Sequence, residues 1–167
     1  MAVGLETSNP SLAVPTDLTI GTKAEEHKMG DWRDYIAVVL TDNRVEDVAI
    51  VGLHDNRAVW ASKPGGFLAA ICPEEVERVV GRDRGGILLT GVTVGGRRAA
   101  VVRDHMIGPE DELRFMDLRT IGSEGLALAV VQTTKTLVFV LGRRGVHAGT
   151  VNKKGWDVAT YLRRKGV

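Results

Sequence analysis

The chain has 167 residues, of which 44% are hydrophobic and 26% are charged, the mixture expected of a globular domain with one core. Its 22 basic and 21 acidic side chains leave a formal net charge of +1, so we expect no nucleic-acid partner. The one cysteine, Cys72, excludes an intrachain disulfide and a cysteine-based zinc site. The sequence has neither an apolar run that could cross a bilayer nor a signal peptide, so we expect a cytoplasmic protein.

Residues 1–28 differ in composition from the rest of the chain. They contain two prolines and no aromatic residue, and they show no sustained hydrophobic period. This composition predicts a disordered N-terminal extension at 1–28, followed by a folded domain at 29–167. A regulatory or binding tail is the alternative. A further hypothesis is that Met29 serves as a second start.

The hydrophobic pattern of residues 29–167 predicts three helices and seven strands. Helices are expected from Asp31 to about Asn43, from Pro73 to Gly81, and from Asn152 to Lys165. The last helix has a predicted buried stripe made of Val151, Gly155, Val158, Ala159 and Leu162. Strands are expected at 47–53, 57–62, 87–95, 97–104, 112–120, 126–133 and 136–142.

Turn residues determine how these strands pair. The Gly95-Gly96 pair and Thr134-Lys135 predict tight hairpins, and strands joined by tight turns pair antiparallel. The sequence therefore predicts an α+β fold with a central antiparallel sheet of about six or seven strands and helices on its faces.

Each candidate catalytic or metal-binding pattern in the sequence is better explained by a structural role. The segment Gly95–Arg98 lacks the G-K-[ST] signature of a phosphate loop, so a hairpin turn explains it better. No two histidines lie three or four residues apart, so we expect no metal and no cofactor. We expect a binding protein, not an enzyme; a small enzyme using His105 and Cys72 is the weakest alternative.

Two features favour binding. Trp32, Tyr35, Trp60 and Tyr161 would line one groove if the terminal helices were neighbours, and such a groove suits a polyproline II peptide. The alternative is that these rings only pack the helices onto the sheet.

The second feature is charge: residues 143–167 carry seven basic side chains against Asp157, a net +6. This surface suits an acidic protein face or anionic lipid headgroups, the alternative being a solvated helix face.

The order of motifs over residues 29–167 resembles the profilin family. The motifs are W-x-x-Y at 32–35, V-W-A at 59–61, G-G-x-x-x-x-V-x-R-D at 95–104, M-D-L-R-T at 116–120 and G-V-H-x-G-x-x-N-K-K at 145–154. The sequence is most similar to the vertebrate-type members, and among them to the third, testis-type group. The resemblance implies N- and C-terminal helices packed on one face of the sheet and shorter helices on the other. It also implies a monomer with three ligands: monomeric actin, proline-rich proteins and phosphoinositide lipids.

The resemblance assigns ligand roles to individual residues. The residues matched to the proline-rich groove are Trp32, Tyr35, Trp60 and Tyr161. The residues matched to the actin surface are Val101, Arg103, Arg119, Val146, His147, Gly149, Asn152, Lys153, Trp156 and Asp157. Phosphoinositide contacts are expected at Arg98, Arg119, Lys153, Arg163 and Arg164, so lipid and actin should compete.

Trp156 and Tyr161 lie five residues apart, about 140° around a helix, and should face different partners. The sequence also departs from the family pattern. Val167 stands where many animal profilins end in a tyrosine that closes the groove, so we expect weaker binding of proline-rich peptides. Arg144 replaces an acidic or neutral residue, and Ala148 replaces a glycine. These departures keep an alternative open, an adaptor with weak actin binding that acts through proline-rich ligands and phosphoinositides.

Overall fold

The computed structural model describes residues 29–54, 56–108, 113–122 and 124–167, and for Met29–Trp32 it describes the backbone alone. The expected extension at 1–28 lies outside the described residues. The elements are, in order, α2 (Met29–Val39), β1 (Val45–Gly52), β2 (Val59–Ser62), the 3₁₀ helix η1 (Phe67–Ala70), α3 (Pro73–Val80), α4 (Arg84–Thr90), β3 (Val92–Val94), β4 (Arg97–His105), β5 (Arg114–Thr120), β6 (Ala127–Gln132), β7 (Thr136–Gly142) and α5 (Ala148–Arg164).

Seven strands form one antiparallel sheet in the order β2-β1-β7-β6-β5-β4-β3. Apart from β2 and β3, which lie at opposite edges of the sheet, strands that follow one another in the sequence pair as neighbours. The Gly95-Gly96 turn has positive φ at both glycines, which suits the twist of a two-residue hairpin. The first and last strands also pair, β1 with β7, so the sheet joins the two halves of the chain. The predicted α+β sheet is confirmed.

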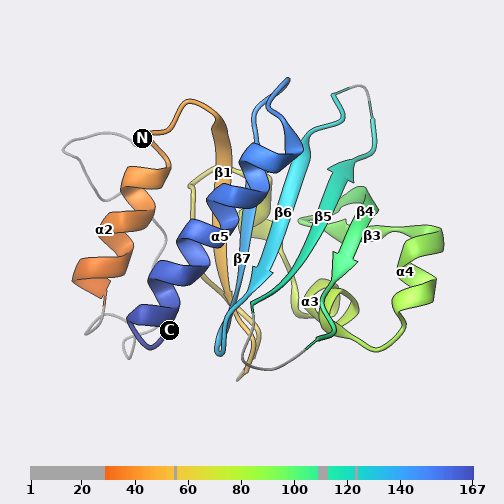
Figure 1. Cartoon of the computed structure of the whole chain (residues 1–167), viewed down its shortest axis with the longest axis horizontal. Helices are drawn as coiled ribbons and strands as arrows, with labels where there is room; N and C mark the ends of the chain where they lie inside the picture. The colour runs from red at the N-terminus through yellow and green to blue at the C-terminus, as the bar shows by residue number, and fades with distance from the viewer. Residues whose placement is uncertain (1–28, 55, 109–112, 123) are drawn as a thin grey trace.

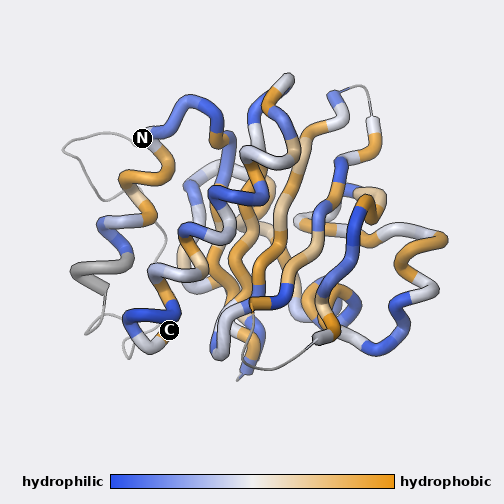
Figure 2. The backbone as a smooth tube through the Cα atoms, viewed as in Figure 1, coloured by the Kyte–Doolittle hydropathy of each residue, from blue (hydrophilic) through white to orange (hydrophobic). Residues whose placement is uncertain are grey.

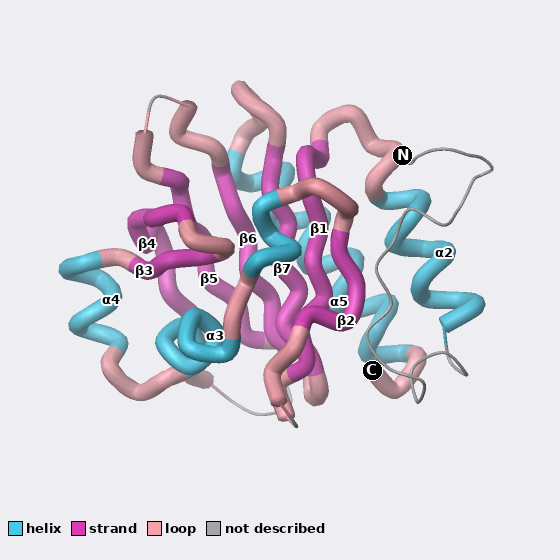
Figure 3. Tube along the Cα trace, turned by 180° about the vertical axis from the view of Figure 1, so that it is seen from behind, coloured by secondary structure: helices cyan, strands magenta, loops and turns pink. Residues whose placement is uncertain are grey.

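The helices form two layers around this sheet. α2 and α5 cover one face and run side by side in opposite directions, whereas η1 and α3 cover the other face and α4 lies at its edge (Figures 1 and 3). β7 is buried along its whole length because both layers cover it. Its Val138 and Val140 face α5, and Leu137 and Phe139 face α3. Figure 2 shows the apolar residues concentrated in these central strands.

α5 begins one turn before the predicted start at Asn152, because His147 caps it. The Nδ1 atom of His147 accepts the backbone N–H of Gly149 at 3.0 Å. The predicted stripe is confirmed: Val151, Gly155, Val158, Ala159 and Leu162 are its buried residues. No helix in the described ranges is long and apolar enough to cross a membrane.

The strand predicted at 87–95 is wrong over its first half. Residues 84–90 form α4, in which the carboxylate of Asp83 caps the N-terminus by accepting the N–H of Gly86 at 2.9 Å. Gly91 ends the helix at a φ of +78°. The apolar run misleads because Ile87 alone is buried, while Leu88 and Leu89 face solvent.

A buried carboxylate binds the backbone of η1. Asp47 of β1 is 1% exposed, and its Oδ2 atom accepts the backbone N–H of Leu68 at 3.2 Å. Its Oδ1 atom accepts no hydrogen bond from the described residues. Burial raises the pKa of Asp47 to about 6, although the N–H groups of Leu68 and Val48 and the charge of Lys63 act to lower it.

Because its pKa is raised, Asp47 lowers the free energy of unfolding by an amount that depends on pH. Because the folded protein holds this proton more tightly than the unfolded chain, the contribution of Asp47 to stability falls as the pH rises from about 4 to about 6. We expect Asp47→Asn to remove this contribution while its amide oxygen keeps the contact with Leu68. The unfolding free energy of the variant minus that of the wild type should therefore be about 2 kcal/mol larger at pH 7.5 than at pH 4.5. Urea unfolding at both pH values measures this gain; an identical difference at the two pH values would contradict it.

Candidate functional site

Asp117 of β5 joins three elements on the face of the sheet that α5 covers. The guanidinium group of Arg103 on β4 donates to Oδ2 of Asp117 from Nε at 3.1 Å and from Nη2 at 2.9 Å. The amide of Asn152 on α5 donates to Oδ1 at 2.7 Å. The side chain of Asp117 is 11% exposed, whereas that of Arg103 is 54% exposed. The buried acid therefore holds a cation in a fixed position at the surface.

Aromatic rings extend this surface toward α5. The ring of His105 stacks on Phe115 with centroids 4.7 Å apart, and Phe115 packs against Trp156 of α5 at 5.6 Å. The guanidinium carbon of Arg103 lies 5.1 Å from the centroid of Phe115. Arg103, Asn152 and Trp156, three residues matched to the actin surface, thus share one connected patch. Sequence reasoning did not single out Phe115 or Asp117, although period-two alternation in β5 places both on the same face as Arg119.

A β-bulge places Arg103 on this face. Val101 pairs with Leu118 and Arg103 pairs with Asp117, so Val102 is an extra residue in β4. The bulge reverses the alternation beyond this point. Val101 consequently packs against the core on the α3 side, away from Arg103, although both were matched to one surface.

The other residues matched to actin lie on β5, in the segment before α5 and on α5 itself. Arg119 is exposed on β5 and donates to the carbonyl of Gly125. Val146 packs against the core beneath α5, and His147 and Gly149 form the exposed cap of α5. Lys153 and Asp157 form an ion pair of 3.4 Å along one side of the helix.

The second surface lies where α2 meets α5. Tyr35 of α2 stacks on Tyr161 of α5, with ring centroids 4.1 Å apart and planes inclined by 14°. Burial, and then the charge of Asp157 and the neighbouring Tyr161, raise the pKa of Tyr35 above its ordinary value. The hydroxyl of Tyr35 therefore stays protonated at neutral pH and can donate a hydrogen bond. Asp157 thus lies toward this ring pair.

Trp60 borders the same core cluster as the two tyrosines. It is the extra residue of a bulge in β2, because Ile50 pairs with Ala61 and Val51 with Val59. The indole lies over Gly52, where a Cβ atom would come within 2.6 Å of the ring nitrogen. The side chain of Trp32, the fourth expected ring, lies outside the described residues.

Val167 occupies a core position at the end of α5. It is 5% exposed and packs in the cluster beneath α2 and α5. Its backbone carbonyl accepts the hydroxyl of Thr133 at 3.0 Å. The residue that departs from the family tyrosine therefore contributes to the core and adds no ring to the aromatic surface.

The residues expected to contact phosphoinositides fall into two groups. Arg98 on β4 and Arg119 on β5 lie on paired strands, and Lys153 lies in the first half of α5. Arg163 and Arg164 lie in the last turn of α5, about 15 Å from Lys153 along the helix axis. The first group borders the Arg103 patch and the second borders Tyr161. Among the residues in the described ranges, no group of three metal-ligating side chains could hold a metal ion.

The family model for profilin matches residues 30–167. Profilin-3 of Bos taurus is 49% identical over 138 residues, covering 83% of this chain and 99% of that protein. Profilin-1 of Mus musculus is 40% identical over 139 residues, covering 81% and 98% of the two chains.

The solved structures that are similar to this chain are also profilins. The crystal structure of rat profilin 2a is similar with a TM-score of 0.76 at 37% identity, covering 83% of this chain and 99% of that one. Mouse profilin IIa, solved in complex with a double repeat from the FH1 domain of mDia1, gives a TM-score of 0.74 at 36% identity and covers 82% and 99%. The fold, the matching family model and these relatives show that the chain belongs to the profilin family.

Proposed function

We propose that this chain binds monomeric actin and regulates actin polymerisation through the patch around Arg103, Asn152 and Trp156. The observation that carries the proposal is the buried Asp117, which fixes an exposed cation beside a partly exposed aromatic ring. Arginine and tryptophan are the residue types most often found at the energetic centres of protein interfaces. The mechanism is linked binding, without covalent chemistry, and it operates in the cytoplasm at the actin cytoskeleton.

The second part of the proposal concerns proline-rich partners, which bind where α2 meets α5. Tyr35, Tyr161 and Trp60 offer flat apolar rings with hydroxyl and indole N–H donors, the chemistry that recognises a polyproline II helix. The structure of mouse profilin IIa in complex with a double repeat from the FH1 domain of mDia1 supports this assignment at 36% identity. Delivery of actin to proline-rich assembly factors follows if both surfaces are occupied together.

The third part concerns phosphoinositide headgroups, which bind the two basic groups around Arg119 and Arg163. Because Arg119 and Lys153 also border the actin patch, lipid and actin compete. The departures at Arg144 and Ala148, in the segment that leads into α5, favour a second candidate, an adaptor that binds actin weakly. Actin affinity separates the two candidates.

Replacing Arg103 tests the actin patch. We expect Arg103→Gln to weaken the binding of monomeric actin about tenfold, because the fixed charge is lost. Glutamine is a better probe than glutamate here, since a glutamate would face the buried carboxylate of Asp117. The measurement is the shift in the critical concentration of actin polymerisation.

Arg82→Gln is the matched control, because Arg82 is an exposed arginine between α3 and α4, away from the patch. The control should bind actin like the wild type. Equal actin affinity for Arg103→Gln and Arg82→Gln would contradict the assignment. The proline-rich surface does not need a loss of actin binding to function, in the wild type or in either variant.

Removing one ring tests the proline-rich surface. We expect Tyr161→Ala to weaken the binding of an octaproline peptide about fivefold, because the partner of the Tyr35 stack is lost. The change in intrinsic tryptophan fluorescence on peptide titration measures this affinity. Tyr161→Phe keeps the ring and should bind within about twofold of the wild type. A peptide affinity that Tyr161→Ala leaves unchanged would show that the peptide binds elsewhere.

A further inference from the structure

Phe115 of β5 lies where β4, β5 and α5 meet, and the family motifs assign no ligand role to it. It pairs with His105 of β4 on one side and with Val131 of β6 on the other. Its side chain is half-buried and packs against the core cluster beneath α5. This position brings the ring of Phe115 into contact with side chains of both β4 and α5.

Phe115 contacts two of the side chains that form the proposed actin patch. The guanidinium carbon of Arg103 lies 5.1 Å from the centroid of the Phe115 ring. The ring of Trp156 lies 5.6 Å away, with the two planes inclined by 58°. Since Arg103 is opposite Asp117 in the strand pairing, it reaches Phe115 diagonally across β4 and β5. Phe115 therefore links a cation of the sheet to an aromatic ring of α5.

His105 supports the ring of Phe115 from β4. The two rings stack with their centroids 4.7 Å apart and their planes inclined by 21°. A stacked aromatic pair adds stability beyond the apolar area that it buries. Because His105 and Trp156 pack against it from two different elements, the ring of Phe115 has little freedom to turn away from Arg103.

Both side chains that contact Phe115 offer hydrogen-bond donors to a partner. Asp117 accepts two N–H groups of Arg103, and no other described residue accepts one. Within the described ranges, no residue accepts the indole N–H of Trp156. The two donor groups thus lie beside an apolar ring. Such a surface fits a partner segment that combines carbonyl or carboxylate oxygens with an apolar side chain.

We propose that Phe115 is a positioning residue of the actin surface, which holds Arg103 and Trp156 in the arrangement that actin recognises. The proposal rests on the proposed actin function and extends it to a residue outside the family motifs. Asp117 fixes the guanidinium group through two of its N–H donors, and Phe115 supports the same group through its ring. Side chains that are held in place before binding lose less conformational freedom when the partner arrives.

A double-variant cycle on actin affinity tests the proposal, with the shift in critical concentration as the measurement. We expect Phe115→Leu, which stays apolar but lacks the ring, to weaken actin binding about fivefold. If Phe115 and Arg103 acted independently, combining this change with Arg103→Gln would weaken binding about fiftyfold. Because Phe115 acts partly through Arg103, we expect the double variant to bind only about fifteenfold more weakly than the wild type. Phe115→Tyr keeps the ring and should bind actin within about twofold of the wild type.

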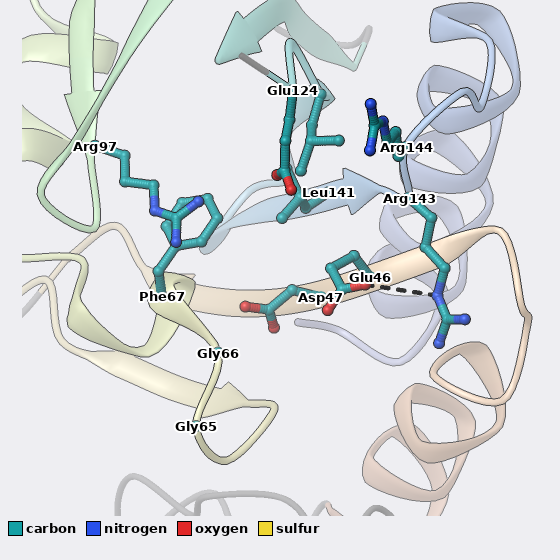
Figure 4. A pocket seen from close by; sticks show the side chains of 11 residues that line it. Glu46, Asp47, Gly65, Gly66, Phe67, Arg97, Glu124, Leu141, Arg143 and Arg144 are labelled. Carbon is teal, nitrogen blue, oxygen red and sulfur yellow. Dashed lines mark ion pairs between the residues drawn. The ribbon is translucent and has the colours of Figure 1, made fainter. Parts of the chain in front are cut away.

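Phe67→Leu is the matched control, because Phe67 also contacts an arginine through its ring. The guanidinium carbon of Arg97 lies 4.3 Å from the centroid of Phe67, and this pair belongs to the α3 side of the sheet (Figure 4). The control variant should bind actin like the wild type. Phe115→Leu should in turn bind octaproline like the wild type, because α5 keeps its place. Loss of octaproline binding in Phe115→Leu would assign the ring to the fold and overturn the proposal.

The NMR signal of the Arg103 Nε–H group tests the positioning role without actin. An aromatic ring shifts the signals of nearby protons, so this signal should move in Phe115→Leu and stay in place in Phe67→Leu. An unmoved signal would overturn the positioning role, and so would a double variant that binds about fiftyfold more weakly. If Arg103→Gln weakens actin binding and Phe115→Leu does not, the proposal alone is wrong. If neither variant weakens it, the proposed actin patch is wrong, and the proposal falls with it.

Discussion

The close approach of α5 to the sheet is the constraint on which both proposed surfaces depend. A Cβ atom at Gly155 would lie 3.0 Å from Cγ2 of Val131 and 3.5 Å from Cβ of Ala129, so glycine lets the helix pack against β6. This distance allows Asn152 to reach Asp117, Trp156 to reach Phe115 and Tyr161 to stack on Tyr35. A larger residue at position 155 would push away the helix that carries all three contacts. Lys154 adds a second tie through its ion pair of 3.0 Å with Asp42 in the segment between α2 and β1.

Local patterns in the sequence predict most of the fold. The buried stripe of α5, the glycine hairpin and the strand at 136–142 follow from periodicity and turn chemistry alone. α4 was missed because an apolar run of this length fits a short strand as well as a helix. The deciding features were the cap at Asp83 and the positive φ at Gly91, together with the exposure of Leu88 and Leu89, which only the tertiary structure reveals.

The candidate site could be predicted only in part, because some of its features depend on neighbouring strands and not on local sequence. The family motifs assign Arg103, Asn152 and Trp156 to one surface, and the structure places them in one patch. Bulges at Trp60 and Val102 depend on the neighbouring strand, so strict alternation would place Arg103 with Val101 on the wrong face.

The two proposed surfaces use different sides of one helix, so actin and a proline-rich peptide should bind at the same time. Trp156 contacts Phe115 over the sheet, whereas Tyr161 contacts Tyr35 of α2. The most direct measurement is native mass spectrometry of this chain mixed with latrunculin-bound monomeric actin and an octaproline peptide. We expect a 1:1:1 complex at saturating concentrations. If the peptide instead displaces actin, so that only the two binary complexes form, the account of independent surfaces is contradicted.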